Sequence, residues 1–246
     1  MKLGRYPQWS IEKDAMDCKE DYYTLGINNI AYINDDENKK HAYINWEEHK
    51  DDTYSFKSTP IEWRILEEEE DRLLVLSEYN IECKQFHDKE EPVIWENSSL
   101  RKWLNTTFLE NAFDIREREC ILESEIINEW NPVCFVQGGD ITKDRIFLLS
   151  FRDVMNVKFG FESYITSSQT REAKNTDWTK VMGALTNPEK GMGWWWLRSS
   201  GQDCQFGGRV DYSGHVFFIG KQATLWGGVR PAMYLDKKKL RELEGL

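Results

Sequence analysis

The sequence contains no apolar run of about 18 residues, the length that a membrane-spanning helix needs. Its first residues, MKLGRYPQWSIEKD, include neither an apolar leader segment nor a small-residue cleavage site. We therefore expect no membrane partner and a cytoplasmic protein. If a leader has been trimmed from the sequence, the expected location becomes extracellular.

Cysteines are few and are not grouped. The sequence has five, an odd number with no C-x-x-C pair: Cys18, Cys83, Cys120, Cys134 and Cys204. This pattern favours reduced thiols over a disulfide framework or a zinc ribbon, although a single disulfide stays open. The spacings from Cys83 to His87 and from Cys204 to His215 match no common metal site. We expect no metal and no cofactor.

Basic charge is also scarce. The formal net charge is -11, and no basic stripe offsets it. Because nucleic-acid affinity comes largely from Lys and Arg displacing counterions, we expect no nucleic-acid partner. The acidic run at residues 67–71 is typical of a solvated loop tip, since adjacent carboxylates do not by themselves converge on one cation.

Common catalytic motifs are missing as well. The sequence has no G-x-S-x-G, no P-loop and no H-E-x-x-H. No histidine lies near Cys120 in sequence, so we interpret this residue as a small buried hydrophobe and not as a nucleophile. These absences favour a protein without catalytic activity.

Hydrophobic residues are plentiful. They make up 40% of the 246 residues, with 11 tryptophans among them, which is enough for a sizeable core. We predict one domain over residues 1–246, ending in a solvated, weakly helical tail at 236–246. Residues 10–58 are crowded with charged side chains, yet 22–35 have the composition of a hairpin. We interpret 10–58 as an inserted arm; a mobile acidic loop is the alternative.

Alternating residues predict strands on both sides of the acidic run. Residues 3–8 have the composition of a short edge strand. Further on, Ile61, Trp63 and Ile65 alternate with charged residues, and 72–78 supply a returning strand. A hairpin is therefore expected here.

Two helices are predicted next. The first lies within residues 95–113, where apolar residues recur at helical spacing: Leu100, Trp103, Leu104 and Phe108. The second begins at Asp114, with Glu117 three positions later as in a capping box, and carries three apolar residues: Ile115, Cys120 and Ile121. We interpret both helices as scaffold.

The second half of the chain is predicted to hold strands around a long connection. Residues 145–150 predict a buried strand, and Ser150 with Asp153 caps the short helix after it. The polar connection 159–193 is the first place to expect a binding site, because loops of this length are often functional. Residues 194–235 predict short strands of an antiparallel meander, with a hairpin turn at 212–214.

Six segments carry a resemblance to a known family. They are GRYPQ (4–8), PIEWRIL (60–66), WENSSLRKWLNTTFLENAF (95–113), IFLLS (146–150), WWLRSSG (195–201) and GGVRPAM (227–233). In this order they resemble a bacterial domain-of-unknown-function family with WWLRSPG and GVRPA motifs. Those two motifs are also similar to ones in the C-type-lectin-like superfold, which includes formylglycine-generating enzymes (sulfatase-modifying factors). The resemblance implies an α+β fold of twisted antiparallel sheets with two flanking helices and long loops.

The sequence departs from these relatives in three ways. Ser200 stands where the motif has proline, and residues 10–58 separate motifs that normally lie closer together. The Glu-Pro-Asn and Trp-Asn-Asp segments that hold calcium in sugar-binding members are missing. The reversed order at 187–189 is a coincidence in our interpretation, so calcium-dependent sugar binding has no support.

Aromatic residues on the predicted loops are the candidate ligand-binding residues. They are Trp178, Trp194, Phe206 and Trp226, joined by the basic residues Arg198 and Arg209. In the run of three tryptophans, Trp195 and Trp196 are expected in the core and Trp194 at the surface. Arg198 and Arg230 have side chains suited to bind a carboxylate or phosphate, but structural pairing with an acid is favoured.

Three functions follow from these patterns. The first is a non-catalytic recognition module that binds a protein or a glycan through loop aromatics. The second is an enzyme of the formylglycine-generating type or another metal-assisted enzyme, with Cys204 and a partner cysteine in one cleft. The third is an assembly protein that uses the arm 10–58.

Overall fold

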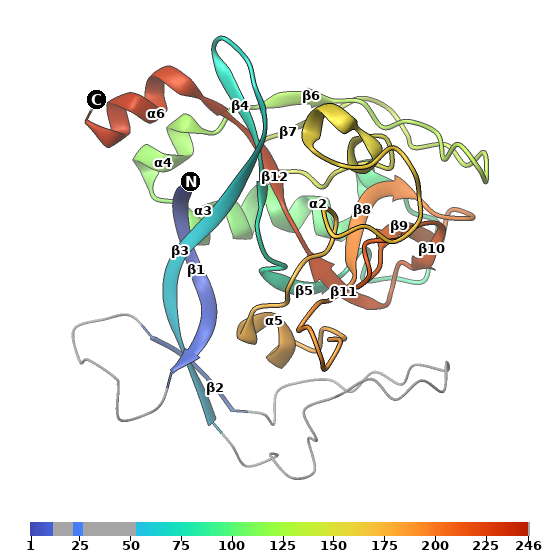
Figure 1. Ribbon diagram of the computed structural model, residues 1–246, viewed down its shortest axis with the longest axis horizontal. Coiled ribbons are helices and arrows are strands. Elements are labelled where there is room, and N and C mark those ends of the chain that lie inside the picture. Colours follow the sequence, from blue (N-terminus) through green and yellow to red (C-terminus); the bar gives the residue numbers. More distant parts are fainter. Residues whose placement is uncertain (12–21, 27–52, 246) are drawn as a thin grey trace.

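The computed structural model describes residues 1–11, 22–26 and 53–245. These residues form an α+β structure in which antiparallel strand pairs predominate (Figure 1). Most of the arm predicted at 10–58, including the hairpin turn expected after residue 26, lies outside the described residues.

The first sheet has the strand order β1-β3-β4-β12, and β2 also pairs with β3. The strands are β1 (Lys2–Ile11), β2 (Tyr22–Gly26), β3 (Thr53–Glu68), β4 (Arg72–Ser77) and β12 (Ala232–Asp236). The strands predicted at 3–8, 61–65 and 72–78 are confirmed as parts of β1, β3 and β4. Every residue of β4 after its first is buried, as expected for a strand inside a sheet.

A β-bulge in β3 changes which side chains face the core. Ile61 and Trp63 are buried as predicted, but Ile65 is 48% exposed. The register with β4 shifts between Ile65 and Glu67, and the buried position passes to Leu66. The prediction that Ile65 faces inward was wrong, because alternation along one strand does not reveal an extra residue in the pairing.

The second sheet has the order β10-β9-β8-β11-β5. Its strands are β5 (Glu82–Gln85), β8 (Trp195–Ser200), β9 (Phe206–Val210), β10 (Val216–Gln222) and β11 (Trp226–Val229). The antiparallel meander is confirmed for β8, β9 and β10, with the turn at 212–214. It does not extend to β11, which lies parallel to β8 and antiparallel to β5.

The first predicted helix forms as consecutive pieces. They are the 3-10 turn η3 (Trp95–Asn97), α2 (Ser99–Trp103), the π-helical η4 (Leu104–Phe108) and α3 (Leu109–Ala112). Ser98 caps α2, because its Oγ accepts a hydrogen bond from the Arg101 backbone N–H at 3.1 Å. Leu100, Leu104 and Phe108 are buried as predicted, whereas Trp103 is only half-buried.

The second predicted helix is α4 (Ile115–Cys120). Its capping box is confirmed, with Asp114 and Glu117 exchanging hydrogen bonds of 2.9 Å. Cys120 and Ile121 are buried, whereas Ile115 is 69% exposed. A residue in the first turn of a short helix need not share the buried face of the last turn.

Shorter elements complete the structure. They are β6 (Ser124–Ile126), β7 (Thr142–Asp144), η5 (Asp153–Met155), η6 (Val157–Phe159), α5 (Asp177–Val181) and α6 (Lys237–Glu244). Residues 146–149 are buried as predicted, but their backbone meets the first sheet in an isolated bridge from Phe147 to Ala232, so they form no regular strand. The tail forms the helix α6, in which Leu240 is buried and most of the other residues are exposed.

The connection 159–193 is fastened to the core. Arg171 is fully buried there and donates hydrogen bonds to four backbone carbonyls: Val154, Glu162, Thr166 and Gly214. A charged side chain that holds four carbonyls fixes the path of the chain around it. The connection is therefore a packed part of the structure, and the expectation of a binding site there stays a prediction.

Candidate functional site

Two of the predicted ligand-binding tryptophans are buried. Trp178 is 9% exposed in α5, and its Nε1 donates to the carboxyl of Glu82 at 3.1 Å. Trp194 is 6% exposed, and its ring lies edge-on to Trp196 with 4.7 Å between centroids. The prediction that Trp194 stays at the surface was wrong, because β11 and Arg209 cover it. Neither tryptophan offers a face to a ligand.

The arginines of the two sequence motifs have structural roles. Arg198 Nη1 lies 2.6 Å from an oxygen of Asp153, which confirms the expected pairing with an acid. Burial opposes ionisation of Asp153, but the charge of Arg198 and hydrogen bonds outweigh it and lower the pKa of this carboxyl. Arg230 is fully buried, donates to the carbonyl of Ser77 at 2.9 Å and lies over the ring of Trp195; burial lowers its pKa to about 9.

The remaining candidates lie on the second sheet. Arg209 in β9 places its guanidinium 4.5 Å from the ring centroid of Phe217 and 5.6 Å from that of Trp194. Phe206 begins the same strand and is half-buried. Trp226 begins β11 and is also half-buried. Of the predicted ligand-binding residues, Arg209 and Trp194 thus lie against each other. Trp226 instead lines an open groove.

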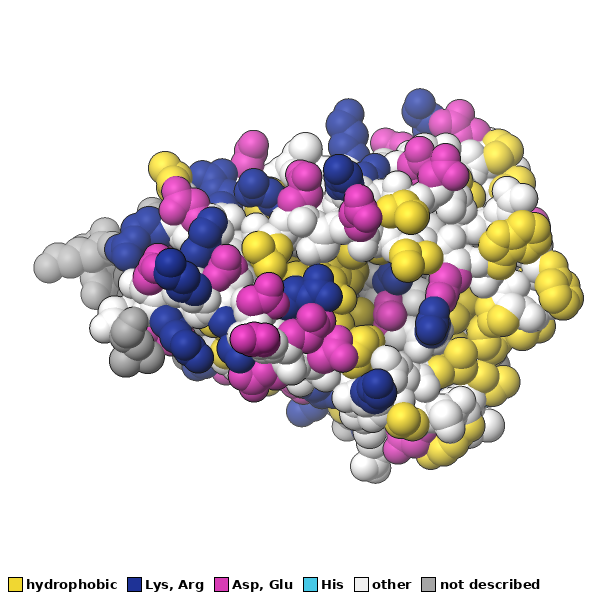
Figure 2. Space-filling model, turned by 90° about the horizontal axis from the view of Figure 1, so that it is seen from above, with side chains coloured by type: hydrophobic (Ala, Val, Ile, Leu, Met, Phe, Trp, Pro, Cys, Tyr) yellow, Lys and Arg dark blue, Asp and Glu magenta, His cyan; other side chains and the backbone are white. Residues whose placement is uncertain are grey.

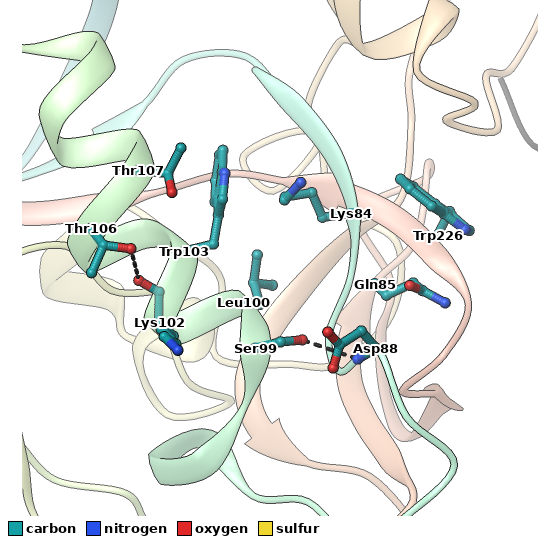
Figure 3. A pocket seen from close by; sticks show the side chains of 10 residues that line it. All are labelled: Lys84, Gln85, Asp88, Ser99, Leu100, Lys102, Trp103, Thr106, Thr107 and Trp226. Atoms are coloured by element: carbon teal, nitrogen blue, oxygen red, sulfur yellow. Dashed lines mark hydrogen bonds between the residues drawn. The ribbon is translucent and has the colours of Figure 1, made fainter. Parts of the chain in front are cut away.

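We call this place the tryptophan groove (Figure 3). It is a hollow of about 330 Å³ between β5, the helical stretch α2 to η4 and the start of β11. Ten residues line it: Lys84, Gln85, Asp88, Ser99, Leu100, Lys102, Trp103, Thr106, Thr107 and Trp226. Trp103 and Trp226 stand on opposite sides in Figure 3, and Lys84 lies between them. The groove therefore combines aromatic walls with polar side chains.

Helical periodicity places three of the ten lining residues on one face. Ser99, Trp103 and Thr106 follow one another at helical spacing, so their side chains point the same way. Leu100 is buried and holds the helix against the core. Thr106 lies in the π-helical η4, and its hydroxyl donates to the Lys102 carbonyl at 2.7 Å. Single π-helical turns inside a helix are frequent at functional sites.

Trp226 is positioned by its pairing with Gln85 of β5. The residue after it, Gly227, lets β11 pack on the tryptophan core. A Cβ at this glycine would lie 2.3 Å from a ring carbon of Trp194 and 2.6 Å from Nε1 of Trp196. Because no side chain fits there, the glycine fixes the distance between β11 and β8. The buried tryptophans thereby determine where the exposed one stands.

Lys84 supplies a positive charge inside the groove. Its Nζ lies 4.8 Å from the ring centroid of Trp103, a cation–π distance. Its carbonyl accepts a hydrogen bond of 2.9 Å from Trp196 Nε1, which ties β5 to the core. Gln85 beside it donates to the Thr224 carbonyl at 2.6 Å. Lysine and glutamine are thus held on a strand that the second sheet keeps in place.

The sequence patterns identify Trp226 but miss Trp103 and Lys84. The apolar stripe of the first helix assigns Trp103 to the scaffold. The polar residues Ser99, Thr106 and Thr107 lie on the same helix face as Trp103. Because a helix face in the core is normally apolar, these residues indicate that Trp103 faces a surface. Lys84 carries no local signal, because its role depends on a helix that approaches β5 from elsewhere in the chain.

A second surface feature is an apolar loop between β6 and β7. Five large hydrophobic side chains are exposed along it: Ile127, Trp130, Val133, Phe135 and Ile141. Figure 2 shows hydrophobic side chains gathered at the end of the molecule where Figure 1 places this loop. The buried side chain of Asn131 holds it, donating to three carbonyls and accepting from two backbone N–H groups.

The cysteines offer little to the metal-assisted enzyme hypothesis. Cys83 and Cys120 are buried, and burial raises the pKa of both thiols, so neither is a ready partner for the exposed Cys204. Cys134 is half-buried, and Cys18 lies outside the described residues. Among the residues that the structure describes, no group of three or more His, Cys, Asp and Glu side chains is placed to hold a metal ion.

The first residue of β5, Glu82, has a buried carboxyl group. Glu82 accepts hydrogen bonds from the Tyr6 hydroxyl at 2.8 Å, from Trp178 Nε1 and from the Cys83 backbone N–H. Burial is the main cause that raises its pKa. The carboxyl joins β1, β5 and α5 and does not line the groove. We interpret it as structural.

Comparison with known proteins gives one match. The model of the family described as Domain of unknown function (DUF6273) matches residues 70–237, which is more than half of the chain and includes all ten residues of the tryptophan groove. No curated protein and no solved structure matches the chain. In the described part of the chain, none of the helices is both long and apolar enough to cross a membrane.

Proposed function

The chain belongs to the DUF6273 family, and we propose that this member is a non-catalytic recognition module that binds a glycan in the tryptophan groove. The observation that carries the proposal is the position of Trp103 and Trp226, two half-buried indoles on opposite sides of one open hollow. Large aromatic side chains left open in a concave site are a common basis of recognition.

A sugar ring fits this arrangement chemically. Its C–H faces are apolar and slightly positive, so they pack on the electron-rich face of an indole. Its hydroxyl groups need hydrogen-bond partners when water is displaced. Donors and acceptors are present on the groove floor and rim, where Asp88, Ser99 and Thr107 lie. The groove thus offers partners for both parts of a sugar.

The same lining supports binding without catalysis. Most glycoside hydrolases use two carboxyl groups that face each other across the scissile bond. Of the ten residues that line the groove, Asp88 is the one with a carboxyl group. A single exposed carboxylate suits hydrogen bonding to a hydroxyl group. We therefore propose that the ligand is held and released unchanged.

The C-type-lectin-like superfold remains a proposal as well. It is supported by the resemblance of the tryptophan and GVRPA motifs and by antiparallel sheets with helices beside them. Sugar binding here would proceed without calcium, because the groove lining contains one carboxylate and calcium takes six to eight oxygen ligands. Glycan binding that persists in a chelating buffer is the expected behaviour.

The test is a glycan array followed by titration calorimetry with the best oligosaccharide. We expect Trp226→Ala to weaken binding by about tenfold or more, because it removes one stacking face. Trp130→Ala is the matched control, since this tryptophan is 58% exposed on the apolar loop outside the groove. Equal binding by wild type and Trp226→Ala, or no binding to any glycan, would overturn the proposal.

A protein ligand is the second candidate, and the apolar loop is the observation that favours it. Exposed hydrophobic patches on a loop held in one conformation are typical of protein-docking surfaces. Under this alternative Phe135→Asp abolishes capture of a protein partner while Trp226→Ala leaves it intact. If both variants capture the same proteins as wild type, this loop is not a docking surface.

A further inference from the structure

We infer that the ligand of the tryptophan groove is an acidic glycan whose carboxylate binds Lys84. The inference rests on the proposed function and names the class of sugar. It starts from the charge of the groove, which differs in sign from that of the chain. The chain has a formal net charge of -11, whereas a lysine stands at the centre of the groove.

Lys84 is a half-buried cation without a carboxylate partner among the described residues. Three other buried or half-buried cations are paired with carboxylates: Arg64 with Glu78, Arg101 with Asp144 and Arg198 with Asp153. Buried Arg171 and Arg230 instead donate to backbone carbonyls, whereas the ammonium group of Lys84 lies over an aromatic ring at the groove. Its position over Trp103 directs the charge into the hollow.

The carboxyl of Glu82 interacts electrostatically with Lys84, and Asp88 lines the same groove, but neither forms an ion pair with Lys84 within the described residues. Glu82 is buried on the same strand and is occupied by Tyr6, Trp178 and a backbone N–H. Asp88 lies at the exposed rim of the groove. The carboxyl of Glu82 is therefore already engaged in hydrogen bonds. A ligand carboxylate can approach the ammonium group of Lys84 from the open groove.

A second hollow continues the groove around the start of α2. It measures about 490 Å³ and shares Asp88, Ser99, Lys102 and Thr106 with the first. Together the two hollows are lined by four basic residues, Lys84, Lys89, Arg101 and Lys102, and by two acidic ones, Asp88 and Glu96. The combined lining of the two hollows therefore has an excess of positive charge.

The continuous path points to an oligosaccharide with more than one acidic unit. Lys102 lies on the shared border, is exposed and makes no ion pair within the described part of the chain. Lys89 lies 3.8 Å from Glu91, and Arg101 is held by Asp144, so both are partly neutralised. We therefore place the first carboxylate at Lys84 and a second, weaker contact at Lys102.

The test compares sugars that differ only in charge. Trisaccharides of galacturonate, glucuronate and mannuronate are titrated against their methyl esters, which keep the ring and remove the negative charge. We expect the wild type to bind at least one acid about tenfold more tightly than its ester, because a charge-assisted contact is lost in the ester. In Lys84→Met, which keeps the apolar stem on Trp103, this preference is expected to disappear. Lys2→Met is the matched control, since Lys2 lies on the first sheet.

The outcomes separate the two claims. Equal affinity of the wild type for acid and ester overturns the inference and leaves glycan binding in place. An unchanged acid preference in Lys84→Met also overturns it. Tighter binding of a sulfated trisaccharide than of any uronate overturns the assignment of a carboxylate. If neither acids nor esters bind while the array yields a neutral glycan, the inference is overturned and glycan binding stands; if no glycan of the array binds, or if Trp226→Ala binds as well as wild type, the proposed function itself is overturned.

Discussion

Strand β8 and the tryptophan groove both contain tryptophans, but they use them differently. Trp195 and Trp196 are fully buried in β8, and each indole N–H donates to a backbone carbonyl, of Arg171 and Lys84 respectively. Trp103 and Trp226 are half-buried on the walls of an open hollow. The most conspicuous motif of the sequence thus builds the core, and the surface it supports carries the candidate site.

The difference follows from position within the sheet. Strand β8 has neighbours on both sides, and all six of its residues are buried. Trp226 is the first residue of β11, and it lines the groove together with residues of α2 and η4. A tryptophan inside a sheet contributes to stability, whereas one at the end of a strand keeps a face for a ligand.

The largest expected change in the free energy of unfolding is for a tryptophan of β8. Trp195→Ala should lower the free energy of unfolding by about 3–5 kcal/mol, because it leaves a cavity and removes the ring beneath Arg230. Urea unfolding followed by circular dichroism measures the loss. Trp195→Phe keeps much of the volume and should fall between alanine and wild type. A loss below about 1 kcal/mol for the alanine variant would contradict the core assignment.

A smaller effect is expected at the ion pair beside β8. Asp153→Asn should lower the free energy of unfolding by about 3 kcal/mol at pH 7, since Arg198 keeps its buried charge without a carboxylate. The pKa of Asp153 is lower in the folded protein than its ordinary value of 3.8. Its contribution is therefore present above pH 3.8 and is lost as the pH falls through the folded-state pKa.

Urea unfolding at a series of pH values checks this dependence. The curves of Asp153→Asn and wild type should converge below pH 3.8, as far as the proteins stay folded. Asp71→Asn, at an exposed turn position, is the matched control and should follow the wild type throughout. A constant difference between Asp153→Asn and wild type at every pH would show that the charge of Asp153 is not the cause.

The smallest expected effect on stability is at the groove. Trp226→Ala should change the free energy of unfolding by about 1 kcal/mol or less, because one face of the ring already meets solvent. Trp130→Ala should behave similarly. If Trp226→Ala instead costs as much as Trp195→Ala, Trp226 belongs to the core and the contrast between the two regions fails. Thermal unfolding of the three variants side by side decides this.

Local patterns predicted much of the scaffold. Alternation identified β3 and β4, and the spacing of Asp114 and Glu117 identified the start of α4. The core position of Trp195 and Trp196 followed from the same reasoning. Each of these features depends on residues that are neighbours in sequence, so a short stretch of sequence is enough to predict it.

The candidate site depends on contacts between distant segments. Trp226 meets Gln85 through the pairing of β11 with β5, and Trp103 reaches the same place from α2. No local pattern encodes this meeting. The misplaced predictions have similar causes: Ile65 was displaced by a bulge in pairing with β4, and Trp194 is covered by β11. Sequence patterns therefore described the strands better than the surfaces where they meet.

The most direct measurement of the central claim is the indole N–H spectrum of the protein during titration with the tightest-binding uronic trisaccharide. The 11 tryptophans give separate reporters, which Trp103→Phe, Trp226→Phe and Trp130→Phe assign. Binding in the groove predicts that the signals of Trp103 and Trp226 move most, while those of Trp195 and Trp130 stay in place. Movement of the Trp130 signal alone, or of none of these indoles, would contradict the account.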